Sequence, residues 1–179
     1  MKYIIMTEGT CEKAFIDVII DKDLFVFPIK CLLYEQIFHA RQINQKLIEK
    51  INQLPANEKI TIIRIGDKLS DKLLIPEEIE NKVVKCLKIC IKPEFEILHL
   101  IFQKEDSKYI RNYKSKFKPS EYLHSIDCKY EKSYEYNYSF FNKIPNKDLI
   151  FLIKEYSNKR KKVHNNDELL LEEILKKDV

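Results

Sequence analysis

The sequence contains only two glycines and no tryptophan, and no apolar run reaches the roughly 20 residues that a membrane-spanning helix needs. An average protein carries about 7% glycine, so this chain uses glycine only at special positions. Both copies, Gly9 and Gly66, stand next to an acidic residue at the end of a strand-like apolar run. We interpret them as positions where the backbone turns tightly or comes close to a ligand. An ordinary turn is the alternative for each.

The five cysteines are an odd number and have no CxxC spacing. Because most of them stand in apolar segments, this pattern favours buried free thiols over disulfides or a zinc site, and it is typical of the cytosol. A hydrophobic content of 45% excludes a wholly disordered chain. We therefore expect a soluble cytoplasmic protein with no membrane attachment.

The stretch from Tyr3 to Phe15 has the pattern of a ligand-binding joint. Residues 3–6 are apolar and favour a buried strand, and apolar residues from Thr10 to Ile20 recur with helical spacing. Glu8 stands between the strand and the helix. In an open α/β sheet, ligands bind at the carboxyl ends of the strands, so we expect the Glu8 carboxylate to point into a site.

A second joint of the same kind follows Ile60–Ile65, where Gly66 and Asp67 come directly after an apolar run. If the two strands are parallel neighbours, the carboxylates of Glu8 and Asp67 emerge at the same edge of the sheet. They are then near enough to share a cation. Mg²⁺ binds one or two protein carboxylates together with phosphate oxygens, which fits this pair.

The remaining pattern predicts an α/β fold with a mainly parallel sheet flanked by helices over residues 1–103, followed by a helical extension over 104–179 that packs on this core. Leu24–Ile29 is expected to be an edge strand or a connector. Within the core we also predict a helix over Gln36–Leu54, a helix from near Pro76 that leads into a strand over Ile89–Ile91, and a helix with Pro93 at its first position. The extension is predicted to hold helices over Ser107–Phe117, Pro119–Ile126, Glu131–Asn142, Lys147–Asn158 and Asp167–Lys176, with Asp167 as a helix N-cap and a basic linker over 158–166.

Residues 104–162 carry 15 basic and 8 acidic side chains and eight of the ten tyrosines. Basic and aromatic side chains together favour contact with nucleic acid. A solvated helical surface whose tyrosines pack inward gives the same composition, and this alternative stays open. The candidate phosphate contacts are His39 and Arg41, near the expected helix start, and Lys104, Lys108, Arg111, Lys114 and Lys118, which share one face if their helix is continuous. For His39 and Arg41 the alternative is a solvent-facing helix start.

Three motifs in order make the chain resemble the Toprim (topoisomerase-primase) superfamily, and most closely the small RloB-like and OLD-type Toprim nucleases. They are Glu8-Gly9-Thr10-Cys11-Glu12, the acidic Asp67 at a strand end, and Pro93-Glu94-Phe95-Glu96. Glu94 can also be explained as an acidic residue in a first helical turn. The usual acidic motif of the family is Asp-x-Asp, but here Leu69 takes the second place and Asp71 follows two residues later.

The resemblance implies a Mg²⁺- or Mn²⁺-dependent nuclease of RNA or DNA in a prokaryotic defence system or a mobile element. It implies Glu8, Asp67 and Asp71 as metal ligands and catalytic residues, with Glu8 in general acid/base work. Supporting roles fall to Gly9, Glu12, Gly66, Lys68 and Glu96, and a larger partner protein such as an ATPase is implied. Leu69 favours the alternative of a catalytically weak module that binds nucleic acid or a partner protein. A third alternative is a structural or adaptor protein.

Overall fold

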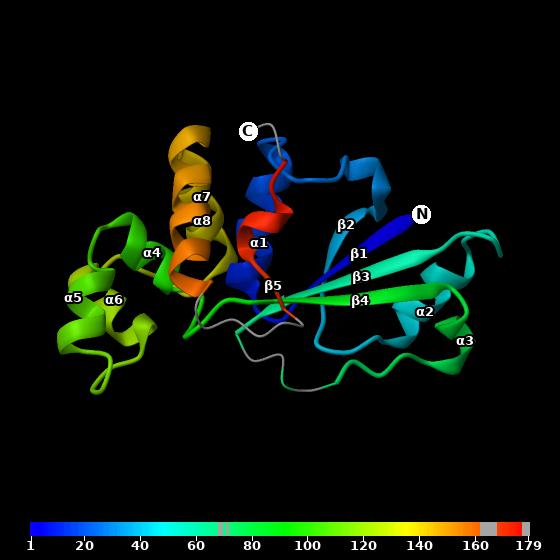
Figure 1. Cartoon of the computed structure of the whole chain (residues 1–179), viewed down its shortest axis with the longest axis horizontal. Coiled ribbons are helices and arrows are strands. Elements are labelled where there is room, and N and C mark those ends of the chain that lie inside the picture. Colours follow the sequence, from blue (N-terminus) through cyan, green and yellow to red (C-terminus); the bar gives the residue numbers. More distant parts are fainter. Residues whose placement is uncertain (68–69, 71, 162–167, 177–179) are drawn as a thin grey trace.

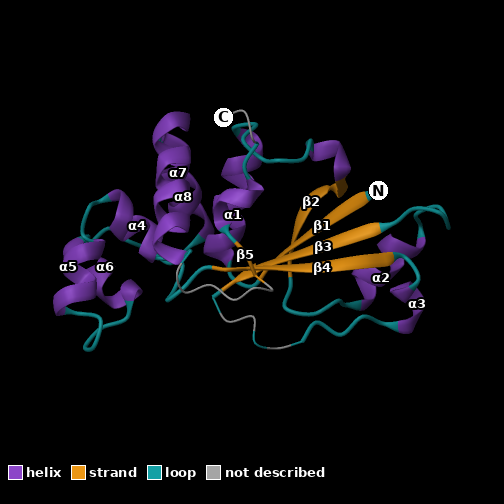
Figure 2. Ribbon diagram, viewed as in Figure 1, coloured by secondary structure: helices purple, strands orange, loops and turns teal. Residues whose placement is uncertain are grey.

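Five parallel strands form one sheet in the order β2-β1-β3-β4-β5 in a computed structural model of the chain (Figures 1 and 2). The structure describes residues 1–67, 70, 72–161 and 168–176. The strands are β1 (Lys2–Thr7), β2 (Leu32–His39), β3 (Ile60–Gly66), β4 (Val83–Cys90) and β5 (Glu168–Leu169). The helices are α1 (Thr10–Asp21), α2 (Gln45–Asn52), α3 (Glu77–Glu80), α4 (Ile97–Phe102), α5 (Asp106–Asn112), α6 (Pro119–Ile126), α7 (Tyr134–Lys143) and α8 (Asn146–Arg160), with 3₁₀ turns η1 (Ile29–Cys31) and η2 (Leu171–Ile174). The predicted α/β class with a parallel sheet is confirmed.

The apolar runs of β1 and β3 form the centre of the sheet. Every residue of β3 is buried, and Ile5 of β1 is in register with Ile63 of β3. Central parallel strands are covered on both faces, so they read as continuous apolar runs without alternation. This is why the two strands could be recognised from their sequences.

Helices cover both faces of the sheet. On one side α1 buries Phe15 and Ile19 in the larger core, and on the other α2 and α3 bury Ile51 and Ile79 against Ile62 in the smaller core (Figure 1). The connection through α1 leads from β1 outward to β2, and the connection through α2 returns past β1 to β3. The order of strands therefore reverses between β1 and β3.

The helices α4–α8 lie at the end of the sheet where its strands finish, opposite to the end where β1 begins (Figure 1). Here α7 packs against α1, and α8 packs against α4. The chain then returns to the sheet, because β5 pairs with β4 and η2 packs on α8. The larger core contains residues from Ile5 to Leu175, so both predicted parts of the chain contribute to it.

The predicted helix over Gln36–Leu54 is wrong in its first half. Ile37 and His39 belong to β2, where they pair with Ile5 and Thr7, and the helix begins only at Gln45. The side chain of Asn44 accepts a hydrogen bond from the backbone of Leu47 at 3.0 Å and so caps α2. Apolar residues of the strand happen to continue the helical spacing of α2, so periodicity alone merged the two elements. Leu24–Ile29 is a connector, as one of its two interpretations predicted.

The predicted helix after Pro76 is also too long. It ends at Glu80, and β4 begins at Val83, whose β-branched side chain favours a strand. The outer half of β4 is mostly exposed and includes Lys85, so its sequence lacks a buried-strand pattern. The helix predicted to start with Pro93 begins instead at Ile97, after a turn that buries Phe95 and Glu96, and the Lys92–Pro93 peptide bond is cis.

In the C-terminal part, α6 and α8 match their predictions closely, and three other predictions need correction. The helix predicted to reach Phe117 ends at Asn112, and α7 begins at Tyr134 because Ser133 caps it. The helix predicted over Asp167–Lys176 is replaced by β5 and η2. The predicted cap Asp167 lies outside the described residues, as do 162–166 of the predicted linker, whose first residues belong to α8.

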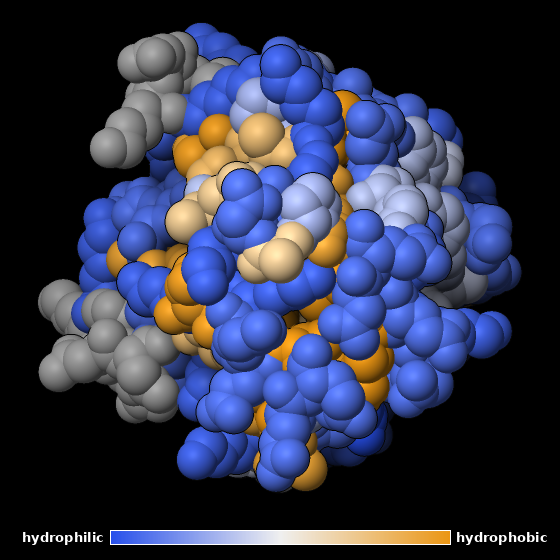
Figure 3. All heavy atoms as spheres, turned by 90° about the vertical axis from the view of Figure 1, so that its right-hand side faces the viewer, coloured by the Kyte–Doolittle hydropathy of each residue, from blue (hydrophilic) through white to orange (hydrophobic). Residues whose placement is uncertain are grey.

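Within the described ranges, no helix combines the length and the apolar character that crossing a membrane requires. The side of the molecule away from the helices α4–α6 carries mostly hydrophilic residues, with hydrophobic ones showing between them in narrow stretches (Figure 3). A cavity lies at the other end, where the strands finish.

Candidate functional site

The predicted acidic residues Glu8 and Asp67 directly follow β1 and β3, which are adjacent and parallel. The backbone of Glu8 continues the pairing, because its N–H donates to the carbonyl of Ile65 at 3.0 Å. The two carboxylates therefore leave the same edge of the sheet, as predicted. This edge is where the strand order reverses, and in open α/β sheets ligands bind at that switch point.

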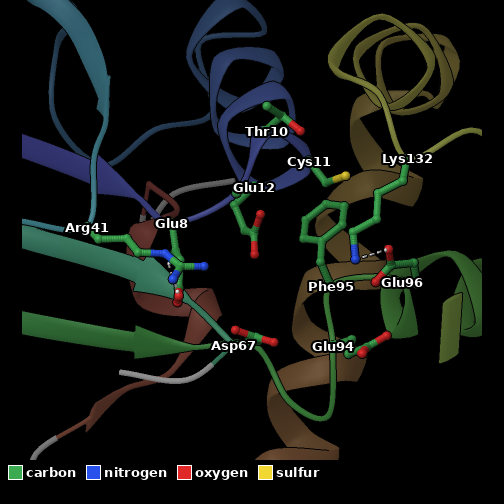
Figure 4. A pocket seen from close by; sticks show the side chains of 11 residues that line it. Glu8, Thr10, Cys11, Glu12, Arg41, Asp67, Glu94, Phe95, Glu96 and Lys132 are labelled. Atoms are coloured by element: carbon green, nitrogen blue, oxygen red, sulfur yellow. Dashed lines mark ion pairs between the residues drawn. The ribbon is translucent and has the colours of Figure 1, made fainter. Parts of the chain in front are cut away.

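A cavity of about 200 Å³ lies beside these strand ends. Its walls come from the β1–α1 joint, the loop after β2, the end of β3, the turn before α4 and the loop before α7 (Figure 4). It is lined by Glu8, Gly9, Thr10, Cys11, Glu12, Arg41, Asp67, Glu94, Phe95, Glu96 and Lys132. Five carboxylates and two cationic side chains thus share one small space.

Glu8 is held from both its backbone and its side chain. A ring nitrogen of His39 lies 3.1 Å from the Glu8 carbonyl oxygen, and Nε of Arg41 lies 3.1 Å from Glu8 Oε1. The other carboxylate oxygen, Oε2, is buried and has no hydrogen-bond partner among the described residues. Burying a carboxylate oxygen without a hydrogen-bond partner lowers the stability of the fold. This atom is therefore a candidate to bind a cation or a hydrogen-bond donor in the cavity.

Glu12 folds back over Gly9 and points into the cavity (Figure 4). A Cβ atom on Gly9 would lie only 2.2 Å from Glu12 Oε2. The φ angle of Gly9 is −115°, so this glycine leaves room for the Glu12 carboxylate and does not serve an unusual backbone conformation. Burial raises the pKa of Glu12 from 4.5 to about 7; the negative charges of Asp67 and Glu96 also raise it, against a backbone hydrogen bond and Lys132. Glu12 can therefore exchange a proton near neutral pH.

The thiol of Cys11 also faces the cavity, but it is not poised for reaction. Burial raises its pKa to about 12, and the carboxylates of Glu96 and Glu12 add to the shift. A thiol that stays protonated at neutral pH is a poor nucleophile. The chemistry of the site therefore belongs to its carboxylates.

On the far wall, Glu96 is completely buried and its Oε1 has two partners. The hydroxyl of Tyr130 donates to it at 2.7 Å, and Nζ of Lys132 lies 3.1 Å away. Nearby, Glu94 accepts a hydrogen bond at 2.9 Å from the hydroxyl of Ser120 in α6. The turn before α4 and the helical extension thus build this wall together.

A divalent cation can be bound by some of the carboxylates that line this cavity. No three His, Cys, Asp or Glu side chains gather into a ready-made metal cage within the described residues. Mg²⁺ does not require such a cage, because it keeps several waters and uses one or two carboxylates together with substrate oxygens. Glu8, with its unpartnered buried oxygen, and Asp67 meet that smaller requirement. The predicted third ligand Asp71 and the supporting Lys68 lie outside the described residues.

Other predicted site residues divide into two groups. Gly9, Glu12, Arg41 and Glu96 line the cavity, whereas His39 is outside its described lining and contacts the backbone carbonyl of Glu8. Gly66 ends β3, and its carbonyl accepts from the N–H of Ile91 at 2.8 Å. His39 and Arg41 do not start a helix, since His39 ends β2 and Arg41 is in the loop that follows.

The predicted basic face does not form. α5 carries only Lys108 and Arg111, because the chain turns back after Asn112. The described lining of the cavity includes none of the five predicted basic residues, which are Lys104, Lys108, Arg111, Lys114 and Lys118. The side chains of Tyr109, Tyr122, Tyr130 and Tyr156 are buried. For these tyrosines, packing into the core is the correct explanation.

Two residues that line the cavity were not predicted as site residues: Lys132 was missed, and Glu94 was explained as an acidic residue of a first helical turn. Lys132 falls inside a predicted helix, although Ser133 is a strong N-cap residue and marks Lys132 as the end of a loop. Nothing in the local sequence shows that this loop reaches the turn before α4. That contact depends on how the extension packs on the sheet.

Comparisons of this chain with protein-family models, with curated proteins and with solved structures give no match. The fold and the cavity define an α/β protein with an acidic site at the switch point of a parallel sheet. Any narrower assignment rests on the residues of that site.

Proposed function

We propose that this protein is a Toprim-type nuclease that uses Mg²⁺ or Mn²⁺ to hydrolyse phosphodiester bonds in RNA or DNA. The observation that carries the proposal is the placement of Glu8 and Asp67 at the ends of adjacent parallel strands, with one buried Glu8 oxygen lacking a partner among the described residues. The order of the Toprim-like motifs along the chain supports it. A role in prokaryotic defence or a mobile element, beside a larger partner such as an ATPase, follows from the resemblance alone.

In this proposal the cation would be held by Glu8 and Asp67, and it would polarise a phosphate oxygen and lower the pKa of a bound water. The residues of the chain then divide the remaining work. Arg41 fixes Glu8, and Glu12 points into the same cavity, where its carboxylate exchanges a proton with the reacting groups. Phe95 and the buried wall around Glu96 limit access of bulk water.

A second candidate is a binding module that holds nucleic acid or a protein without cutting. Three observations favour it. Arg41 occupies one oxygen of Glu8, and the described residues contain no group of three metal ligands. In the sequence, Leu69 also stands where the family has its second aspartate.

Incubation of the purified protein with labelled RNA and DNA, with Mg²⁺, Mn²⁺ or EDTA, separates the two candidates. We expect cleavage with metal, none with EDTA, and a loss of at least about 100-fold in Glu8→Gln, because a neutral amide cannot replace the carboxylate at a cation. Glu77→Gln, on the exposed side of α3, is the matched control and should cleave normally. Binding without cleavage under every metal condition would favour the second candidate.

A further inference from the structure

Lys132 enters the cavity from the loop between α6 and α7, far along the chain from the strand ends. Its Nζ lies 3.1 Å from Glu96 Oε1, and its side chain stays 61% exposed while that of Glu96 is fully buried. The ammonium group therefore sits between a buried carboxylate and the open side of the cavity. Figure 4 shows it on the wall opposite to Arg41, with Glu12 and Asp67 between them.

The position of Lys132 is fixed by groups behind it. Tyr130 donates its hydroxyl to the same Glu96 oxygen at 2.7 Å, so Glu96 is anchored from inside the core. Burial lowers the pKa of Lys132, but the charge and hydrogen bond of Glu96 outweigh this effect and the pKa is raised. The Lys132 ammonium group is therefore positively charged and is kept in place by Glu96.

An ammonium group has three donors, and Glu96 takes one of them. The other Glu96 oxygen is buried without a partner among the described residues, so the carboxylate is not saturated by its contacts there. Five carboxylates line this cavity, and an anionic ligand can approach them only if cations offset their charge. Lys132 is the cation of the far wall.

We propose that Lys132 binds a phosphate group of the ligand beside the carboxylates of Glu8 and Asp67. The ligand class is a phosphate ester, and its identification with a nucleic-acid backbone rests on the proposed nuclease function. In this role Glu96 and Tyr130 are positioning residues that hold the ammonium at the cavity. The helical extension then supplies a ligand-binding residue to the site on the sheet.

Thymidine 3′,5′-bisphosphate is a suitable probe, because it carries phosphate esters and requires no cleavage. Its affinity is measured by isothermal titration calorimetry in the presence of Mg²⁺ for the wild type and for K132Q, K132R and K129Q. Lys129 is the matched control, since it stands in the same loop but is not among the residues that line the cavity. We expect K132Q to weaken binding by about 10- to 100-fold, the range for losing a charge-assisted hydrogen bond, with K129Q unchanged and K132R within a few-fold.

Removal of Lys132 alone leaves the charge of Glu96 buried without its cation, and such a loss can loosen a fold. The double variant E96Q/K132Q removes both charges, and thermal melting shows whether it is folded. If Lys132 binds phosphate, the double variant stays as weak as K132Q. If Lys132 serves only to neutralise Glu96, the double variant regains wild-type affinity, and the proposal is overturned.

The proposal is also overturned if K132Q binds the probe as tightly as K129Q, or if the wild type does not bind it. Cleavage of labelled RNA and DNA, measured in parallel, tests the nuclease function separately. Binding of the bisphosphate through Lys132 without any cleavage would contradict the nuclease and leave the phosphate site standing. Cleavage by the wild type and by K132Q at equal rates would support the nuclease function and contradict the phosphate site at Lys132.

Discussion

At the scale of single residues, Gly9 and Glu12 share a space that has no room for another carbon. We predict that Gly9→Ala displaces the Glu12 carboxylate from the cavity and lowers cleavage at least about ten-fold, as expected when a group for proton transfer is lost. The free energy of unfolding should fall by only about 1 kcal/mol, because the clash is with a side chain that can move and alanine is a poorer N-cap. Cleavage rates and denaturant unfolding measure the two effects.

The variant Glu12→Ala provides the control, because it removes the group that Gly9→Ala displaces. In the double variant the second substitution should cost no further activity, since the two act through the same carboxylate. Full additivity of the two losses would show that Gly9 acts in some other way.

His99 gives a prediction for pH. It is completely buried, and burial lowers its pKa from 6.5 to about 4, although the hydrogen bond to Asn137 and the charges of Glu96 and Asp127 oppose this shift. Between these two values the unfolded chain binds a proton that the folded chain does not, so the free energy of unfolding falls as pH falls. From pH 7 to pH 4 we expect His99 to contribute a loss of about 3 kcal/mol.

Urea unfolding of the wild type and of His99→Leu at both pH values measures this contribution. Glu12, whose raised pKa gives a trend of opposite sign, is present in both proteins, so its effect cancels in the difference. Equal pH dependence in the two proteins would show that His99 is protonated as easily in the folded state as in the unfolded one.

The acidic residues at the strand ends were predictable, but the cationic far wall was not. Glu8 and Asp67 stand beside the only two glycines, directly after apolar runs, and local sequence is enough to place them. Lys132 meets Glu96 across 36 positions of the chain. A contact of that kind depends on tertiary packing, and no spacing rule expresses it.

At the scale of elements, the start of α7 decides where Lys132 stands. The side chain of Ser133 accepts a hydrogen bond from the backbone of Tyr136 at 3.2 Å, and this ends the loop that carries Tyr130 and Lys132. We predict that Ser133→Ala lowers the free energy of unfolding by about 1 kcal/mol, the usual value of an N-cap. The affinity for thymidine 3′,5′-bisphosphate should also fall, because the loop that carries Lys132 is no longer anchored at the start of α7.

Ser125→Ala in α6 is the matched control, since it also removes a serine hydroxyl, which there donates to the carbonyl of Tyr122 in the preceding turn. It should change stability by less than about 0.5 kcal/mol and leave the affinity as it is. A loss of stability in Ser133→Ala without a loss of affinity would mean that the loop is held by its other contacts.

The spacing of apolar residues identifies the buried strands and helices, but it fails for strands that are partly exposed. β3 is buried throughout and is recognisable from its sequence, but the outer half of β4 is mostly exposed and includes Lys85, and its pattern predicts a helix. β2 is hidden by the helical spacing that Ile37 shares with Leu47 and Ile51. The better guide there is the cap residue Asn44, which marks the true start of α2.

At the scale of the whole molecule, the C-terminal segment closes the core. Leu171, Ile174 and Leu175 are buried, and the carbonyl of Ile174 accepts from the N–H of Val26 at 2.7 Å. We predict that a chain ending at Lys161 fails to fold. Three buried aliphatic side chains contribute roughly 5–9 kcal/mol, which is comparable with the whole stability of about 5–15 kcal/mol of an ordinary domain.

Circular dichroism and size-exclusion chromatography of the truncated chain test this expectation, with the full chain as reference. A truncated chain that melts cooperatively near the temperature of the full chain would contradict it. The same experiment bears on the predicted boundary at residue 103, because it measures how far the sheet depends on the C-terminal part of the chain.

The parallel α/β class is predictable from the alternation of apolar runs and helices, but the switch point is not. Placing it requires the strand order, and three of the five strands were missed or predicted only in part: β2 and β5 were not recognised as strands, and only the end of β4 was. The acidic residues Glu8 and Asp67 could still be located from the sequence, because each directly follows a strand. Ligands bind at the carboxyl ends of parallel strands, and this holds for any order of the strands.

The proposed nuclease requires Glu8 and Asp67 to share a divalent cation. Diffraction from crystals grown with Mn²⁺, recorded where manganese scatters anomalously, shows whether they do. We expect an anomalous peak between the two carboxylates, within coordination distance of an oxygen of each, and no such peak in crystals of Glu8→Gln. Ordered carboxylates at this edge with no manganese between them, or manganese bound only elsewhere on the protein, would contradict the shared cation.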